Sequence, residues 1–196
     1  HHASSAASDV YKRQGVDALT HALEAYLVPG LNPLCDGAAL EALKLISKWL
    51  KVAFDDPNNI NARGGMLIGS CFAGVAFMKG LGLVHSISHM IGAEYNTQHG
   101  LTNAIILPPV MRFNLPHVGK KVSFISDAMH LKDYSSDHVV KEIEQILEDR
   151  KPEINLTTYQ HIKKTIDAGT DGLDPYTLSN ICRDLNCLPT DIVEYL

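Results

Sequence analysis

Hydrophobic residues recur every three to four positions along most of the chain, which is the spacing of one face of an α-helix. Residues 15–27 carry this pattern, and a turn rich in Pro and Gly at 29–33 ends it. A second apolar stripe covers 39–54, and Asp36 is placed to cap that helix. Residues 61–78 predict a long helix rich in small residues. Because small side chains let a neighbouring element approach closely, we expect that helix to be central and buried.

The rest of the chain continues the helical pattern in shorter pieces. Residues 84–95 predict a helix, 96–99 a loop, and 103–113 an apolar helix that Pro108-Pro109 must kink or split. Further amphipathic helices are predicted at 118–131, 137–148, 157–168, 175–185 and 190–196. The sequence has no convincing alternating strand pattern, internal repeat or low-complexity tract. The predicted fold class is therefore all-α, a bundle-like domain of about eight to ten helices.

The first 14 residues differ from the rest of the chain. They begin small and polar, lack helical periodicity, and end in Asp9–Gln14, which resembles a translated cloning adapter. We interpret residues 1–14 as a foreign or tag-like segment and 15–196 as one helical domain, with a tag scar or a native arm as the alternatives. If the native sequence starts at Gly15, we expect the chain to be a fragment of a longer protein.

Composition favours a globular protein with a hydrophobic core, since 45% of residues are hydrophobic and 20% are charged. The 17 basic and 22 acidic residues give a net charge of −5, which argues against a nucleic-acid or anionic-membrane partner. No apolar run approaches the ~18 residues of a membrane helix. The cysteines lack the spacing of a zinc knuckle or redox pair, so we expect reduced thiols in a cytoplasmic protein: Cys35, Cys71, Cys182 and Cys187.

One carboxylate and three imidazoles form the most informative chemical pattern. Asp17 and His21 are four residues apart, so on a helix they lie one above the other, about 6 Å apart along the axis. His85 would stand on a second helix, and His99 in the loop that follows it. Carboxylate and imidazole ligands suit Fe(II) and Zn(II) alike. Spacing alone leaves two interpretations open: a four-ligand metal site, or an ion pair with two structural histidines.

The residues around these positions resemble the iron-containing (group III) alcohol dehydrogenase family, in its C-terminal helical metal-binding domain. The segment Gly15–Tyr26 (GVDALTHALEAY) resembles the first signature of that family. The second signature and its continuation are similar to Gly80–His89, Gly92–Gly100 and Asn103–Pro108. The resemblance runs from Gly15 to about Pro116, and it implies a dehydroquinate synthase-like helical fold.

The resemblance also implies a role for each matched residue. Asp17, His21, His85 and His99 would be the metal ligands, and His89 would lie near the nicotinamide and substrate, where it positions the substrate or relays protons. The implied enzyme oxidises alcohols or reduces aldehydes and ketones with NAD(P). Fe2+, with Zn2+ as the alternative, would act as a Lewis acid on a small alcohol or aldehyde substrate.

The sequence departs from the family pattern in three places. Met90 stands where the family usually has proline, and the likeness fades beyond Pro116. The family carries an α/β NAD(P)-binding domain upstream, whereas Gly80–His85 is only G-x-G-x-x-H after a helix, which is no dinucleotide fingerprint. We therefore assign no cofactor-binding residue here, and expect the chain alone to hold metal without appreciable dehydrogenase activity.

Two alternatives to this function stay open at the level of sequence. One is a glycerol dehydrogenase-like or dehydroquinate synthase-like enzyme, a class that tends to use three protein ligands. The other is a non-catalytic helical bundle whose histidines only pack. The oligomeric state is also open, with a homodimer as one alternative. The remaining histidines after the second motif are expected at the surface without a role: His117, His130, His138 and His161.

Overall fold

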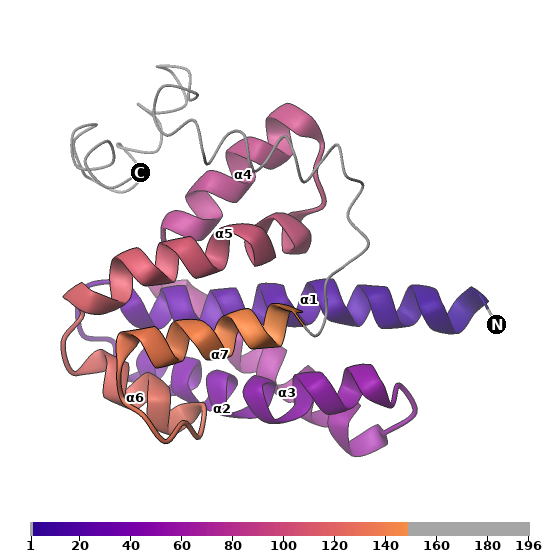
Figure 1. Cartoon of the computed structure of the whole chain (residues 1–196), viewed down its shortest axis with the longest axis horizontal. Helices are drawn as coiled ribbons and strands as arrows, with labels where there is room; N and C mark the ends of the chain where they lie inside the picture. The colour runs from indigo at the N-terminus through magenta and orange to yellow at the C-terminus, as the bar shows by residue number, and fades with distance from the viewer. Residues whose placement is uncertain (1, 149–196) are drawn as a thin grey trace.

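The computed structural model describes residues 2–148, and these residues form α-helices and two short 3-10 helices, without a strand among them (Figure 1). The predicted all-α class is confirmed for this part of the chain, whereas the helices predicted at 157–168, 175–185 and 190–196 lie outside it. In chain order the elements are α1 (His2–Leu27), α2 (Pro33–Asp55), α3 (Ile60–Ala76), η1 (Phe77–Lys79), α4 (Leu83–Tyr95), α5 (His99–Asn114), η2 (Leu115–His117), α6 (Lys121–Ala128) and α7 (Ser136–Glu148).

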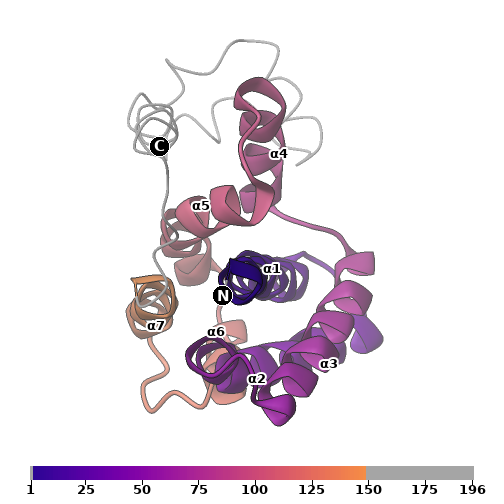
Figure 2. The same ribbon diagram turned by 90° about the vertical axis from the view of Figure 1, so that its right-hand side faces the viewer.

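Helix α1 is the centre of the bundle. Viewed nearly along its axis in Figure 2, α1 is surrounded by the other helices. Its Leu19, Ala22 and Leu23 are fully buried, as an axial helix requires. The helix begins at His2 rather than at Gly15, so residues 2–14 continue it without a break. The origin of those residues stays a prediction.

Helix α3 is peripheral, so the expectation of a central, buried α3 is wrong. Two of its small residues lie close against α2: a Cβ at Gly65 would overlap the Trp49 ring, and one at Gly69 would come 3.0 Å from Cγ1 of Ile46. Others, such as Gly74, have open space around them, and large apolar side chains such as Leu67 and Ile68 are exposed. Small residues on α3 thus permit one close approach, and they do not mark a helix surrounded on all sides.

The segment Ile60–Lys79, which joins α3 and η1, is long and apolar enough by length and composition to cross a membrane. The expectation that no such stretch exists is therefore wrong. Length and composition are weak evidence, since core helices of soluble proteins pass the same test. The segment also carries Arg63 and ends in Lys79, whose Nζ donates to Asp36 Oδ1 at 2.5 Å.

Helix α2 is capped by Asn32, not by Asp36 as predicted. Pro33 occupies the first turn, and the Asn32 Oδ1 accepts a hydrogen bond from the backbone N–H of Cys35 at 3.2 Å. Asp36 Oδ2 accepts from the Asn32 backbone N–H at 3.2 Å, which completes a reciprocal capping arrangement. Helix α2 therefore starts earlier than its apolar stripe.

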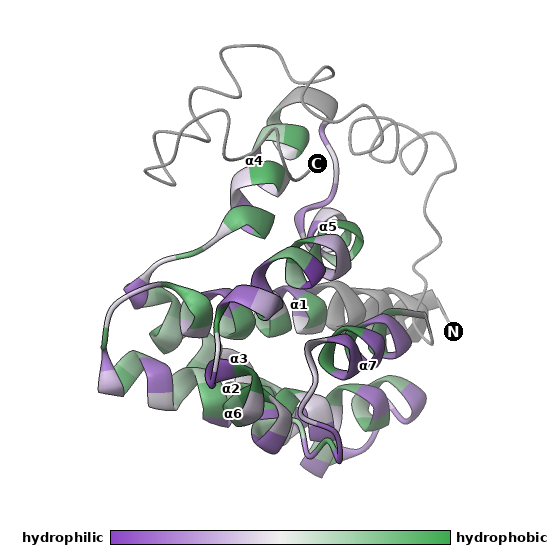
Figure 3. Cartoon of the chain, turned by 60° about the vertical axis from the view of Figure 1, so that its left-hand side comes forward, coloured by the Kyte–Doolittle hydropathy of each residue, from purple (hydrophilic) through white to green (hydrophobic). Residues whose placement is uncertain are grey.

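Helix α5 runs without interruption from His99 to Asn114, with Pro108 and Pro109 inside it. Of the predicted kink or split, the split is wrong. Each proline removes one helical donor, but neighbours such as Leu107 and Val110 are buried, and their packing holds the segment helical. Of the later helices, α6 covers only 121–128 of the predicted 118–131, whereas α7 confirms the helix predicted at 137–148. Helix α7 combines hydrophobic and hydrophilic positions along its length (Figure 3), as a helix packed on one side requires.

Candidate metal centre

Four predicted ligands converge where α1, α4 and α5 meet (Figure 1). One ligand atom from each of Asp17, His21 and His85 lies within 4.8 Å of the others. His99 Nε2 lies 3.2 Å from Asp17 Oδ1, so the fourth residue reaches the same carboxylate. The His21 and His85 rings stack with centroids 4.5 Å apart and planes 10° from parallel. The sequence prediction that these side chains come together agrees with this geometry; their ligation of a metal stays a prediction.

The fourth residue, His99, stands in a different element from the one predicted. It is the first residue of α5 and not part of a loop, because Gln98 caps that helix by accepting a hydrogen bond from the Leu101 backbone N–H at 2.7 Å. The Thr102 hydroxyl donates to Thr97 Oγ1 at 2.7 Å and ties the preceding loop to the same turn. The helix start thus fixes the direction from which His99 meets Asp17.

Burial is uneven across the cluster. The His85 side chain is only 2% exposed, whereas Asp17 is 24% and His99 is 39% exposed. Phe77 of η1 borders the cluster, with its ring centroid 5.6 Å from that of His21. The cluster is therefore closed at His85 and open to solvent near His99, an arrangement that leaves a small molecule access to one side.

His89 lies beside this cluster and not among its close ligand atoms. It follows His85 by one turn of α4, and its ring centroid is 5.7 Å from that of His85 and 5.1 Å from that of His99. The residue is exposed to solvent. The part of it that is shielded from water, together with the neighbouring His99 and His85, lowers the pKa of His89. A neutral imidazole at this position could accept or pass on a proton; its catalytic role stays a prediction.

The donor set fits a divalent cation, as the surroundings of Asn103 indicate. Its Nδ2 donates to Asp17 Oδ1 at 2.7 Å and also lies 3.3 Å from His85 Nε2 and 3.1 Å from His99 Nε2. When both Nε2 atoms are unprotonated, these three atoms are all acceptors, and an amide NH2 with two hydrogens cannot satisfy all of them. Asn103 is fully buried and its Oδ1 has no hydrogen-bond partner. In that protonation state the cluster holds more lone pairs than protein donors, and a cation would satisfy this excess.

Sequence reasoning missed two buried polar residues of this cluster, Asn103 and Glu24. Asn103 follows His99 by four residues, and Glu24 follows His21 by three, so each shares a helix face with a predicted ligand. Glu24 Oε2 lies 2.6 Å from His85 Nδ1. Helical spacing from a known ligand was the signal that could have found both.

The carboxylates of Asp17 and Glu24 raise the pKa of His85. Burial alone would raise the pKa of Asp17, but the hydrogen bond from His85 and the nearby His21 and His99 together lower it. Burial alone would lower the pKa of His85, but hydrogen bonds to Asp17 and Glu24 outweigh burial and raise its pKa to about 9. Without a metal, His85 is therefore a cation at neutral pH, and a metal must displace its Nε2 proton.

Loss of the His85 proton predicts a pH dependence for the metal-free chain. The folded-state pKa of about 9 exceeds the ordinary 6.5, so the stabilisation is complete below 6.5 and disappears as pH rises through 9. We expect the free energy of unfolding, measured in urea with a chelator, to fall by about 1–2 kcal/mol between pH 7 and 9.5. Saturating Zn2+ should abolish that fall. A chelated protein whose stability is flat or rises over this range would contradict the assignment.

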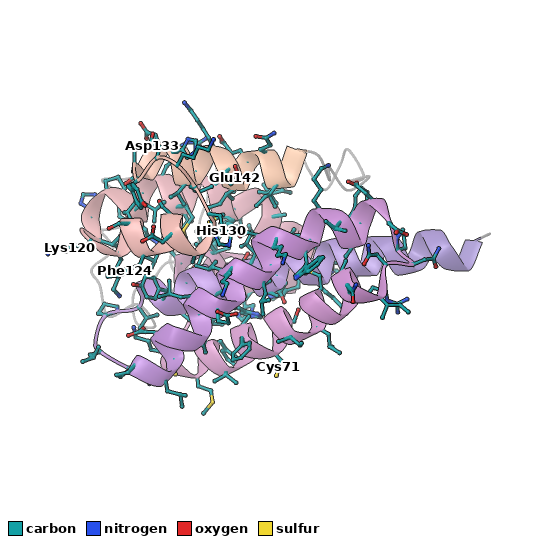
Figure 4. All side chains as sticks on the ribbon, turned by 90° about the horizontal axis from the view of Figure 1, so that it is seen from below. Cys71, Lys120, Phe124, His130, Asp133 and Glu142 are labelled. Atoms are coloured by element: carbon teal, nitrogen blue, oxygen red, sulfur yellow. The ribbon has the colours of Figure 1, made fainter. Side chains whose placement is uncertain are left out.

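The other histidines of the described region lie away from the cluster. His117 and His130 are exposed and His138 is half-buried, while His161 lies outside the described residues. Figure 4 shows His130 on the side of the bundle where Phe124, Asp133 and Glu142 are labelled. The expectation of surface positions thus holds for His117 and His130. Cys35 and Cys71 are free thiols, the first buried and the second exposed, and Cys182 and Cys187 lie outside the described residues.

Comparison with known protein families covers most of the chain. Residues 12–171 match the sequence profile of the family described as "Fe-containing alcohol dehydrogenase family, C-terminal". An NAD-dependent methanol dehydrogenase of Bacillus methanolicus is 43% identical over 116 residues, which are 59% of this chain and 30% of the relative. A lactaldehyde reductase of Escherichia coli strain K12 is 44% identical over 121 residues, 60% of this chain and 31% of the relative.

Solved structures show the same relationship in three dimensions. A crystal structure of 1,3-propanediol oxidoreductase matches 92% of this chain and 49% of its own chain, with a TM-score of 0.76 and 30% identity. An alcohol dehydrogenase from Oenococcus oeni matches 96% of this chain and 51% of its own, with a TM-score of 0.79 and 25% identity. The chain thus spans about a third of the curated relatives' length and about half of these structures.

Proposed function

Because the chain belongs to the Fe-containing alcohol dehydrogenase family, as an alcohol dehydrogenase-like C-terminal domain, we propose that it is the metal-binding lobe of an NAD(P)-dependent alcohol dehydrogenase. The proposed reaction interconverts small alcohols with aldehydes or ketones. One observation carries the proposal: ligand atoms of Asp17, His21 and His85 lie within 4.8 Å of one another, and His99 Nε2 lies 3.2 Å from the Asp17 carboxylate. The chemistry of these side chains supports a divalent metal there.

Within the proposed enzyme, each residue has a defined task. When bound, a divalent metal would act as a Lewis acid on the substrate oxygen while NAD(P) exchanges the hydride. Asp17 would hold the metal and offset its charge, and His21, His85 and His99 would hold it as neutral donors. Buried His85 would exclude water from one side of the site, and the more exposed His99 would leave the other side accessible to substrate.

We assign His89 the task of positioning the substrate or passing its proton to solvent. The support is its place one turn beyond His85, its exposure, and its lowered pKa, which favours a neutral imidazole able to accept a proton. The His89 ring meets the His85 ring edge-on and the His99 ring at a tilt, so His89 lies next to the proposed metal site. It also belongs to the same helix as His85.

Metal identity, assembly and location belong to the same proposal. We propose Fe2+ as the native metal, with Zn2+ as the alternative that the same ligands accept. We propose a cytoplasmic enzyme, with a homodimer as one assembly. The net charge of −5 argues against nucleic acid and an anionic membrane as its partners. The involvement of both Asp17 and His21 favours this enzyme over a glycerol dehydrogenase-like or dehydroquinate synthase-like relative with three protein ligands.

Metal titration combined with an activity assay tests the proposal. The metal-free 196-residue chain should take up one equivalent of Fe2+ or Zn2+, yet give no NAD(P)-coupled turnover of short alcohols or aldehydes. The reason is that residues 2–148 contain no strand that a glycine-rich pyrophosphate loop would follow. A full-length iron-type alcohol dehydrogenase serves as the positive control. Failure to bind metal would favour the non-catalytic bundle, and robust turnover by the chain alone would contradict the division of roles.

A further inference from the structure

Glu24 is a buried carboxylate beside the proposed metal ligands. It lies on α1, on the same face as Asp17 and His21, and it is only 2% exposed. A buried carboxylate without partners is costly, so its contacts indicate what it does. All of its described hydrogen bonds go to one place, the start of α4.

Glu24 caps α4 from another helix. Its Oε1 accepts from the Val84 backbone N–H at 2.6 Å, and its Oε2 accepts from the His85 backbone N–H at 3.3 Å. The N-cap residue of α4 is Gly82, which offers no side-chain cap. A Cβ at Gly82 would come 2.8 Å from Glu24 Oε1. The glycine therefore leaves room for a carboxylate that replaces the missing cap.

The same carboxylate fixes the proton of the His85 ring. Glu24 Oε2 lies 2.6 Å from His85 Nδ1, and an ionised carboxylate can only accept, so Nδ1 must carry the hydrogen. In the neutral imidazole the lone pair then resides on Nε2. That atom faces the cluster, 3.5 Å from Asp17 Oδ1 and 3.3 Å from Asn103 Nδ2.

We propose that Glu24 is a positioning residue that starts α4 and holds a hydrogen on His85 Nδ1, so that Nε2 is the nitrogen that loses its proton and binds a divalent cation. The inference deepens the proposed function and rests on it, because it concerns the same metal site. Outer partners of this kind orient a ligand imidazole and increase its basicity.

Substitution of Glu24 by glutamine separates the two tasks. Glutamine has the same size but one oxygen and one NH2 group. If its oxygen caps Val84, its NH2 faces His85 Nδ1 and forces the hydrogen onto Nε2, toward the cation. If instead the amide turns round to accept from Nδ1, it loses the hydrogen bond from the Val84 backbone N–H, the shorter of the two bonds that cap α4. Glu24→Gln must therefore give up either the hydrogen on Nδ1 or the shorter capping bond.

The test is a Zn2+ titration of the metal-free chain, compared with Glu24→Gln and the matched control Asp36→Asn. Asp36 is also a partly buried carboxylate, paired with Lys79 outside the cluster. We expect Glu24→Gln to weaken Zn2+ binding by about 10–100-fold, and Asp36→Asn to leave it within about 2-fold. Gly82→Ala keeps the Glu24 carboxylate but displaces it, because the added Cβ would come 2.8 Å from Oε1. This variant should also weaken Zn2+ binding, and it tests the position of Glu24 if Glu24→Gln does not fold.

A second readout distinguishes positioning from a purely structural role. Long-range proton–nitrogen NMR spectra of the Zn2+-loaded chain should show the His85 hydrogen on Nδ1, and Glu24→Gln should lose that signal or its hydrogen bond. Equal Zn2+ affinity and an unchanged His85 spectrum in Glu24→Gln would overturn the role of Glu24 while leaving the proposed function intact. Absence of Zn2+ binding by the unaltered chain would overturn both.

Discussion

Replacing His85 by alanine is expected to weaken metal binding more than any other single change, by over about 100-fold, since outer partners alone are worth 10–100-fold. His85 is the most buried of the four proposed ligands; its ring stacks on that of His21, and its Nε2 lies 3.5 Å from Asp17 Oδ1. Its loss would remove the donor on the closed side of the site, where water cannot substitute easily. Calorimetric titration of Zn2+ into the metal-free variant measures the effect.

Two further variants make this result interpretable. His85→Ala also strands the buried Glu24 carboxylate, so part of its effect could come from instability. His99→Ala removes a ligand that is 39% exposed and leaves Glu24 paired, and it should still weaken binding strongly. His130→Ala, at an exposed histidine outside the cluster, should bind like the unaltered chain. Equal binding by His85→Ala, His99→Ala and His130→Ala would remove the basis for the metal site.

Replacing Leu19 by alanine is expected to cost about 2–5 kcal/mol of folding free energy. Leu19 lies on the central helix α1 and is fully buried. The substitution therefore leaves a cavity, which the surrounding helices cannot fill by moving inward. Urea unfolding of the chelated protein measures the loss. Chelation is essential because bound metal adds its own stabilisation and would mask part of the difference.

The matched control is the same substitution on α3. Leu67 is 73% exposed, so Leu67→Ala should change the free energy of unfolding by no more than about 0.5 kcal/mol. The pair tests which helix is central, because the sequence favours α3 and the structure places α1 there. A cost for Leu67→Ala as large as that for Leu19→Ala would show that α3 is covered in the folded protein.

Sequence alone predicts those parts of the site that depend on local helical geometry. Asp17 and His21 share a face because four residues make little more than one helical turn, and this holds in any environment that keeps α1 helical. The motif around His85 and His99 added the other two positions through family resemblance. The all-α class followed from hydrophobic residues that recur every three to four positions, and this pattern forms helices whichever elements they pack against.

Features that depend on the partner of a helix could not be predicted this way. The small residues of α3 show that something approaches closely, but not that a single helix, α2, does so while Leu67 faces outward. Burial of Leu107 keeps α5 continuous through two prolines, and Glu24 caps a helix 60 residues away in sequence. Each outcome is set by contacts between elements, which a one-dimensional pattern does not contain.

The proposed metal site is tested most directly by an anomalous-difference map from a crystal of the Zn2+- or Fe2+-loaded chain, recorded at the absorption edge of the metal. We expect one strong peak about 2.0–2.2 Å from a carboxylate oxygen of Asp17 and from a ring nitrogen of each of His21, His85 and His99. A peak bound elsewhere, or no peak near these four side chains in a metal-saturated crystal, would contradict the proposed site.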